Sequence, residues 1–190
     1  MKELISFVEK FGGINEGEKA IIGNLFKRTA VKKGDYFVEC GNTSKKIAFV
    51  EDGVFRSVYY NKKGDDFTRY FIYEGRFIGD LYNFQIQAPS DDCIEAVTDA
   101  TIWYIDYENF SVLENQVAIW PLLISKLYAF VAESKLKMAS TMKNLDASAC
   151  YELFLHHYPG LANRVPLSML ASYLGITASS LSRIRRAYDR

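Results

Sequence analysis

The sequence contains 190 residues, of which 49% are hydrophobic and 24% are charged. This is the composition of a globular chain with one or two packed domains, and it argues against intrinsic disorder. The 23 Lys and Arg residues balance the 23 Asp and Glu residues, so any attraction to nucleic acid or membrane must be local. No stretch approaches the roughly 18 consecutive apolar residues of a membrane-spanning helix, and residues 1–10 lack the order of a signal peptide. We therefore expect a cytoplasmic protein without a membrane partner.

Cysteines and histidines are few and poorly placed for metal chemistry. Cys40, Cys93 and Cys150 lie far apart in the sequence, so none forms the closely spaced ligand pair of a zinc or iron-sulfur site, and a disulfide framework has no support. The only histidines, His156 and His157, are adjacent and would point about 100° apart on a helix. We expect no metal site, no cofactor and no histidine-built enzyme.

The first part of the chain has the pattern of a small β domain. Between Val31 and Asp106, short runs rich in Val, Ile, Tyr and Phe, such as 54–60 and 101–105, are separated by glycines and turn residues. Strands at this spacing predict an antiparallel barrel or sandwich. In the first 26 positions, apolar residues recur at helical intervals, which predicts a short helical cover over the strands.

After Asp106 the pattern becomes helical. A short helix is predicted over 107–115, and a second one begins at Pro121 and meets no further glycine or proline before Leu145. Apolar and small residues along this helix recur at alternating steps of three and four, the spacing of a helix-pair seam, at Ile124, Leu127, Val131, Ser134 and Met138. The alternative is a stripe that packs on the chain's own barrel. We favour a dimer seam because a helix of about 25 residues, at 1.5 Å per residue, outruns a small barrel.

The last segment predicts a helix-turn-helix. Asp146 is a plausible N-cap for a helix that ends at Pro159-Gly160, and Pro166 then opens the first helix of the motif. Gly175 supplies the turn and Thr177 the cap of a second helix. Every apolar site that the motif requires is filled, at Leu170, Leu174, Ile176, Leu181 and Ile184.

The second helix of this motif is expected to present a cationic face. At 100° per residue, Leu181, Ile184 and Tyr188 fall on one side, and Ser179, Arg183 and Arg186 on the other. We predict that Arg183 reads a base and that Arg185 and Arg186 contact phosphates. The candidate DNA-binding residues are Thr177, Ser179, Ser180, Ser182, Arg183, Arg185 and Arg186. The alternative is a solvated basic helix end that stabilises its own dipole.

Two sets of motifs resemble a known family. The segment Leu170-Ala171-Ser172-Tyr173-Leu174-Gly175-Ile176-Thr177, followed by Ser180-Leu181-Ser182-Arg183-Ile184-Arg185, resembles the DNA-binding end of Crp/Fnr transcriptional regulators. Upstream, Lys33-Gly34-Asp35, Phe49-Val50-Glu51-Asp52-Gly53 and Glu74-Gly75-Arg76-Phe77-Ile78-Gly79-Asp80-Leu81 resemble the β-roll turns of the cyclic-nucleotide-binding fold.

The resemblance implies an α+β fold in three parts: an antiparallel β-roll sensor domain (1–116), a dimerisation helix (117–145) and a helix-turn-helix DNA-binding domain (146–190). It also implies a non-enzymatic homodimer on double-stranded DNA with a two-fold-related site, its half-sites about one helical turn apart. RNA polymerase is a candidate further partner. Movement of the 121–145 helix is the expected lever, and activation and repression both stay open.

The effector cassette departs from the family pattern. Members that bind cyclic nucleotides begin this segment with Gly-Glu-Leu and supply an arginine about ten residues later. Here Gly79-Asp80-Leu81 keeps the beginning, but Ser90 follows, with Asp91 and Asp92 behind it. Carboxylates without the cation would repel a cyclic phosphate, so we expect neither cyclic AMP nor cyclic GMP to bind. The candidate pocket for another, unidentified effector consists of Phe71, Gly79, Asp80, Leu81, Tyr82, Ser90 and Asp91.

Other features limit the remaining alternatives. The aromatic residues near the cassette, namely Phe71, Tyr82, Phe84, Trp103 and Trp120, are expected to be mainly core. The chain ends at Arg190, whereas winged members continue into a hairpin that touches DNA, so fewer DNA contacts are expected. A cupin-type enzyme is disfavoured because no histidine precedes position 156. A sensor or interaction protein of the same fold that acts without DNA binding is the remaining alternative.

Overall fold

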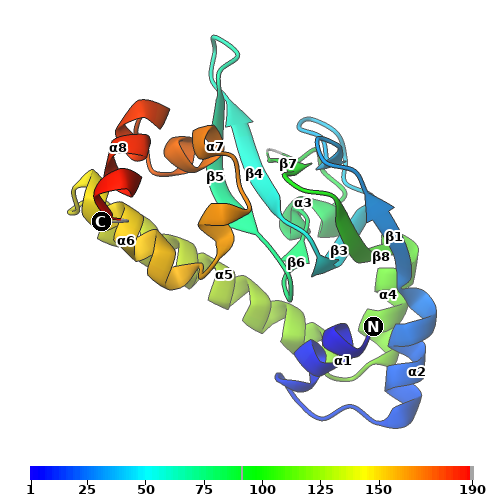
Figure 1. Ribbon diagram of the computed structural model, residues 1–190. Coiled ribbons are helices and arrows are strands. Elements are labelled where there is room, and N and C mark those ends of the chain that lie inside the picture. The colour runs from blue at the N-terminus through cyan, green and yellow to red at the C-terminus, as the bar shows by residue number, and fades with distance from the viewer. Residues whose placement is uncertain (91, 189–190) are drawn as a thin grey trace.

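The computed structural model describes residues 1–90 and 92–188, and Figure 1 shows the arrangement of their elements. A β-roll lies at one end of the molecule, a long helix runs beneath it, and a group of short helices lies at the far end of that helix. The roll is a pair of four-stranded antiparallel sheets. The α+β fold class with an antiparallel roll, a long helix and C-terminal helices is therefore confirmed.

Each sheet joins strands that are distant in the sequence. The first sheet has the order β1 (Lys27–Val31), β8 (Ala100–Asp106), β3 (Lys46–Asp52) and β6 (Phe77–Ile78). The second has the order β2 (Tyr36–Val38), β7 (Cys93–Ala96), β4 (Phe55–Tyr60) and β5 (Asp66–Ile72). Alternating residues of both sheets meet in an apolar interior, formed by Val38, Ala48, Val50, Phe55, Ile72, Ile78, Ile94, Ala96, Ala100 and Ile102.

A second apolar cluster attaches the roll to helices α1 (Lys2–Glu9), α2 (Glu16–Leu25), α3 (Leu81–Gln85) and α4 (Tyr107–Gln116). Phe84 and Trp120 are fully buried in this cluster, and Trp103 is half-buried against it. The expectation that the aromatic residues near the cassette belong to the core is confirmed for these three, whereas Tyr82 is 63% exposed and does not. The short predicted helix at 107–115 also forms, and the Asp106 side chain caps it by accepting a hydrogen bond of 3.0 Å from the Asn109 amide.

The long helix α5 (Trp120–Met142) divides into two parts. Ile124 and Leu127 are only 5% and 9% exposed, because the first turns of the helix lie against α4 and the roll of the same chain. These two residues therefore cannot belong to an intermolecular seam, and the prediction that placed them there was wrong. Farther along, Val131 and Ser134 are exposed and Met138 is half-buried, and the neighbouring Phe130 is 66% exposed.

The C-terminal helices are α6 (Ala147–His157), the 3-10 turn η1 (Leu161–Asn163), α7 (Leu167–Tyr173) and α8 (Ala178–Tyr188). Asp146 caps α6 by accepting a hydrogen bond of 2.9 Å from the Ala149 amide, as predicted. The expected domain boundaries, at 116/117 and 145/146, fall between α4 and α5 and between α5 and α6.

A disulfide joins Cys40 to Cys93, whose Cα atoms are 4.7 Å apart. The expectation that the three cysteines form no disulfide was therefore wrong. The two residues are 53 positions apart in the sequence, but Cys40 follows β2 and Cys93 begins β7, and these strands are paired. Sequence spacing alone does not reveal which strands are neighbours, whereas the sheet order does.

Candidate functional site

Helices α7 and α8 are joined by a tight turn that needs glycine. Gly175 has a φ of +69°, in the left-handed region that L side chains rarely adopt. The turn is closed by the amide of Ile176, which donates to the Ala171 carbonyl at 3.0 Å. Thr177 then caps α8, since its Oγ1 accepts from the Ser180 amide at 3.2 Å. Both residues thus occupy the roles that their types predicted.

The apolar residues of the motif turn inward. Leu170 and Leu181 are completely buried, Ala171 and Leu174 are nearly so, and Ile176 and Ile184 pack at the margin of the same cluster. Packing these side chains fixes α7 and α8 as one unit. The opposite side of α8 is left open to solvent.

The open side of α8 carries polar and cationic groups. Ser179, Arg183 and Arg186 are exposed, while Ser180 and Ser182 are half-buried. The described residues include no ion-pair partner for any arginine of α8, so the positive charge on this side is not neutralised by carboxylates. Such a surface can donate paired hydrogen bonds to an anionic or acceptor-rich ligand.

The arginines of α8 differ in their contacts. Among the residues that the structure describes, the Arg183 guanidinium makes one long contact of 3.4 Å, through Nη2, with the Ser180 hydroxyl. Arg185 is half-buried, and its Nη2 donates at 3.2 Å to the side-chain oxygen of Asn163, the last residue of η1. Arg183 is therefore freer to reach a ligand than Arg185.

The C-terminal helices pack on the outer face of the second sheet. Phe71 of β5 lies with its ring centroid 5.6 Å from that of Tyr173 and 6.1 Å from that of Phe154. The amide of Thr68, on the same strand, donates to the Ser172 hydroxyl of α7 at 3.0 Å. The roll and the α7–α8 unit therefore share one apolar cluster, to which the roll contributes Val54, Phe71 and Val97.

Phe71 does not line the effector cassette, so its assignment to the pocket was wrong. Successive residues of a strand point to opposite faces, and in β5 Tyr70 packs against the roll interior whereas Phe71 packs outward against the C-terminal helices. The alternation of residues in the sequence does not tell which of the two faces the interior. The Tyr82 side chain, 63% exposed, does not line an enclosed pocket either.

A bidentate ion pair forms a second link between the roll and the C-terminal helices. Arg164 contacts both carboxylate oxygens of Glu74, through Nη1 at 2.9 Å and Nη2 at 2.5 Å. The Gly53 amide donates to Oε1 of the same carboxylate at 2.8 Å. Partial burial raises the pKa of Glu74, but the hydrogen bonds from Arg164 and from backbone amides prevail and lower it to about 2. The sequence pattern places Glu74 only in a turn, because its ion-pair partner lies 90 positions away.

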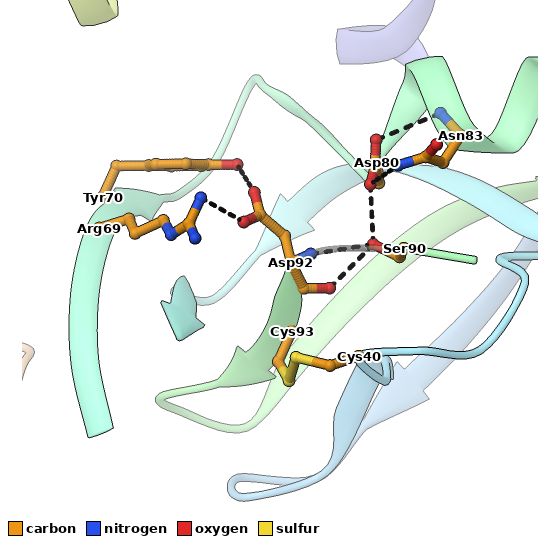
Figure 2. Close-up of polar contacts among 8 residues, drawn as sticks. All are labelled: Cys40, Arg69, Tyr70, Asp80, Asn83, Ser90, Asp92 and Cys93. Carbon is orange, nitrogen blue, oxygen red and sulfur yellow. Dashed lines mark hydrogen bonds and ion pairs between the residues drawn. A yellow bond between two sulfur atoms is a disulfide. The ribbon is translucent and has the colours of Figure 1, made fainter. Parts of the chain in front are cut away.

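The remaining cassette residues gather at the start of α3, as Figure 2 shows. Asp80 caps α3, accepting from the Asn83 amide at 3.3 Å and from its side-chain amide at 2.8 Å. Ser90, only 1% exposed, lies 2.8 Å from the Asp80 carboxylate and 2.9 Å from the Asp92 carbonyl. Gly79 and Leu81 flank Asp80 in the chain, and Asp91 lies outside the described residues.

Asp92 connects this cassette to the neighbouring strand and to the long helix. Its carboxylate forms an ion pair of 2.9 Å with Arg69 and accepts a hydrogen bond of 3.3 Å from the Tyr70 hydroxyl (Figure 2). The Lys135 ammonium of α5 lies 3.9 Å from the centroid of the Tyr70 ring. Burial lowers the pKa of Lys135, against the opposing effect of Asp92. No local sequence pattern links Asp92 to Arg69 and Tyr70, or Tyr70 to Lys135, so these contacts were not predicted.

Comparisons with known proteins agree with this geometry. Residues 28–116 match the family model of the cyclic nucleotide-binding domain. A search of curated protein sequences finds no significant match. A similar fold occurs in the c-di-GMP responsive global regulator CLP of Xanthomonas campestris, with a TM-score of 0.71, 14% sequence identity and 92% of each chain covered. FixK2 of Bradyrhizobium japonicum also has a similar fold, with a TM-score of 0.67, 17% sequence identity, and coverage of 85% of this chain and 83% of FixK2.

A third similar structure is a putative transcriptional regulator of the Crp/Fnr family from Eubacterium rectale (TM-score 0.66, 17% identity, 93% of this chain and 84% of that one). Residues 28–116 thus resemble a cyclic nucleotide-binding domain, and the chain as a whole has a fold similar to that of these three structures. Among the described helices, no single one is long and apolar enough to cross a membrane. Helices α4 and α5 reach that length and composition only as a pair, bent by 113°.

The Glu74–Arg164 pair predicts a specific dependence of stability on pH. Glu74→Gln should destabilise the chain by about 1 kcal/mol at neutral pH, because it removes a charge-assisted bidentate contact. The folded-state pKa of about 2 lies below the ordinary value of 4.5. The stabilisation is therefore fully present above 4.5 and disappears as the pH falls through the folded-state pKa.

Urea unfolding of wild type and Glu74→Gln across this pH range measures the effect. The difference in unfolding free energy should shrink as the solution is acidified. Glu152→Gln, which changes an exposed carboxylate of α6, serves as the matched control and should show little difference at any pH. A Glu74→Gln difference that does not change with pH would contradict the assigned role of this ion pair.

Proposed function

We propose that this chain is a sequence-specific DNA-binding transcription regulator of the Crp/Fnr type, which acts in the cytoplasm, has no enzymatic activity and does not respond to cyclic AMP. The observation that carries the proposal is the open cationic side of α8. Its apolar side is buried against α7 and α6, while Ser179, Arg183 and Arg186 face solvent, and the described residues offer the arginines no carboxylate partner. A recognition helix needs this division of its two sides.

The chemistry of α8 supports a division of roles among its residues. Ser179 and Ser180, near the start of the helix, are short enough to allow the backbone to approach DNA closely. The exposed Arg183 guanidinium can donate two hydrogen bonds to one guanine, which makes it the proposed base reader. Arg186 and Arg185 lie farther along the helix, where contacts with phosphates are the better match. Thr177 and Ser182 complete the proposed surface.

A two-fold-related DNA site requires two copies of α8. The outer part of α5 offers Phe130, Val131, Ser134 and Met138 as the proposed seam with a second copy of the chain, since the first two are exposed apolar residues on a helix that projects beyond the roll. If two copies pair along this helix, the dimer presents two α8 helices, one for each of two successive major grooves of the DNA.

The effector cassette supports insensitivity to cyclic nucleotides. Ser90 occupies the position at which the family supplies its arginine, and its hydroxyl is already bonded to the Asp80 carboxylate and the Asp92 backbone. Of the two nearby cations, Arg69 is paired with Asp92, and the Lys135 ammonium lies over the Tyr70 ring. A cyclic phosphate would meet two carboxylates and no unpaired arginine among these groups.

Substitution of Arg183 tests the recognition helix. Arg183→Ala should reduce binding to a duplex selected from a random pool by about 1–3 kcal/mol and relax the preference at one base position. Arg183→Lys should keep non-specific binding and its salt dependence but lose that same preference, because an ammonium cannot form the bidentate contact. Fluorescence anisotropy at several salt concentrations measures both effects, and Arg76→Ala, an exposed arginine of the roll, is the control. An unchanged base preference in both Arg183 variants would contradict the assignment.

Substitution of Val131 tests the seam. Val131→Glu should convert a dimer to a monomer, because two like charges would meet between apolar residues in the interface. Sedimentation equilibrium reports the mass, and the same charge at exposed Thr29 on β1 is the matched control. If the Val131→Glu protein sediments as a dimer, the two copies associate through another surface.

Titration calorimetry with cyclic AMP and cyclic GMP tests the cassette. We expect no heat of binding at roughly millimolar nucleotide. A micromolar dissociation constant for either nucleotide would show that the Ser90, Asp80 and Asp92 arrangement does accept a cyclic phosphate.

A further inference from the structure

The disulfide lies beside the effector cassette, as Figure 2 shows. Cys93 is the first residue of β7 and directly follows Asp92 in the chain. Its side chain is almost completely buried, whereas Cys40 is exposed. One sulfur of the bond therefore belongs to the exposed residue, and the other is anchored next to the Asp92 network.

Two backbone hydrogen bonds run alongside this covalent link. The Gly41 amide donates to the Ser90 carbonyl at 2.8 Å, and the Ser90 amide donates to the Asn42 carbonyl at 3.0 Å. Thr43 and Pro89 add an isolated β-bridge here, whereas the regular pairing of β2 with β7 is limited to Tyr36 and Val38. The disulfide thus fixes the segment on which both Ser90 and Asp92 lie.

A continuous set of contacts leads from this segment to the helices that carry the DNA-binding surface. Asp92 holds Arg69 and Tyr70 of β5. On the same strand, the neighbouring residues Thr68 and Phe71 contact Ser172 and Tyr173 of α7. In addition, the Tyr70 ring contacts the ammonium of Lys135 on α5. A structural change at the disulfide would therefore be transmitted through residues 68–71 of β5, both to the proposed dimer helix α5 and to the α7–α8 unit.

We propose that the Cys40–Cys93 disulfide is a reversible redox switch of this regulator, and that its reduction weakens DNA binding. The inference rests on the proposed function, because a protein that binds chromosomal DNA works in the cytosol. Disulfides are rare in that compartment, and those that do occur are usually transient and catalytic or redox-sensing. The signal that the cassette receives is then the state of the thiol pool, in place of a small molecule held at a phosphate site.

The chemistry is a two-step exchange with a cellular thiol such as glutathione. A thiolate attacks the sulfur of the exposed Cys40, forms a mixed disulfide and releases the Cys93 thiolate, which takes up a proton. A second thiol then attacks the mixed disulfide and releases Cys40 as a thiol. Two electrons reduce the protein disulfide, and the two small thiols become one small disulfide. Oxidation by that small disulfide reverses both steps.

Reduction removes the covalent restraint on the segment that contains Ser90 and Asp92. The two remaining backbone hydrogen bonds border an exposed loop, where local opening costs little free energy. Asp92 then holds Arg69 and Tyr70 less firmly, and the support that β5 gives to α7 decreases. We expect the reduced chain to bind its selected duplex about tenfold more weakly than the oxidised chain, within the usual range of allosteric coupling.

The experiment compares the full-length chain in mixtures of reduced and oxidised glutathione. Thiol titration under denaturing conditions counts free cysteines, and hydrogen exchange with mass spectrometry follows residues 68–72 and 167–173. Fluorescence anisotropy measures binding to a duplex selected by the oxidised protein. The variant Cys40→Ser/Cys93→Ser should behave like the reduced protein in every mixture. Cys150→Ser, which changes the buried free cysteine, should still switch.

The outcomes separate the switch from the proposed function. Faster exchange in both segments on reduction, together with the tenfold loss of affinity, supports the proposal. Three free thiols per chain in the most oxidising mixture, or equal exchange and equal affinity in both states, would overturn it. If exchange responds to reduction but no form binds DNA, the conformational response to reduction is retained, while DNA binding and its redox control are both refuted. If both forms bind DNA equally and exchange alike, DNA binding is retained and the switch is refuted.

Discussion

The position of α8 depends on one apolar cluster that the roll and the C-terminal helices build together. Helices α6 to α8 form a small unit whose own residues cannot cover all of its apolar surface, and small units of this kind bury too little to be stable alone. The roll completes that core with Val54, Phe71 and Val97. The Glu74–Arg164 ion pair is a second link between the roll and these helices. Any rotation of α8 relative to the roll must therefore expose apolar surface or break this ion pair.

Strand β5 consequently serves three parts of the molecule at once. Its Arg69 and Tyr70 reach the cassette through Asp92, Tyr70 meets Lys135 of the long helix, and Phe71 supports α7. The long helix is the proposed lever of the regulator. The contacts of β5 form a second connection between the cassette and the α7–α8 unit. This is possible because successive residues of a strand point to opposite faces, so that Tyr70 points inward and Phe71 outward.

Local sequence patterns predicted the elements well, whereas contacts between distant residues were not predictable from them. The turn at Gly175, the cap at Thr177 and the buried Leu181 follow from residue type and spacing, and the structure has all three. The burial of Ile124 and Leu127, the outward direction of Phe71 and the disulfide depend on strand register and on how α5 lies against the roll. Those features are set by tertiary packing, since the same heptad spacing suits either an intramolecular or an intermolecular contact.

Scanning calorimetry of the full-length chain tests most directly whether the roll and the C-terminal helices are one cooperative unit. A shared core predicts a single transition whose calorimetric and van't Hoff enthalpies agree, and Phe71→Ala should lower the midpoint of that whole transition. Two resolved transitions in the wild-type chain, with Phe71→Ala shifting only one of them, would contradict the account. They would show that α8 is positioned independently of the roll.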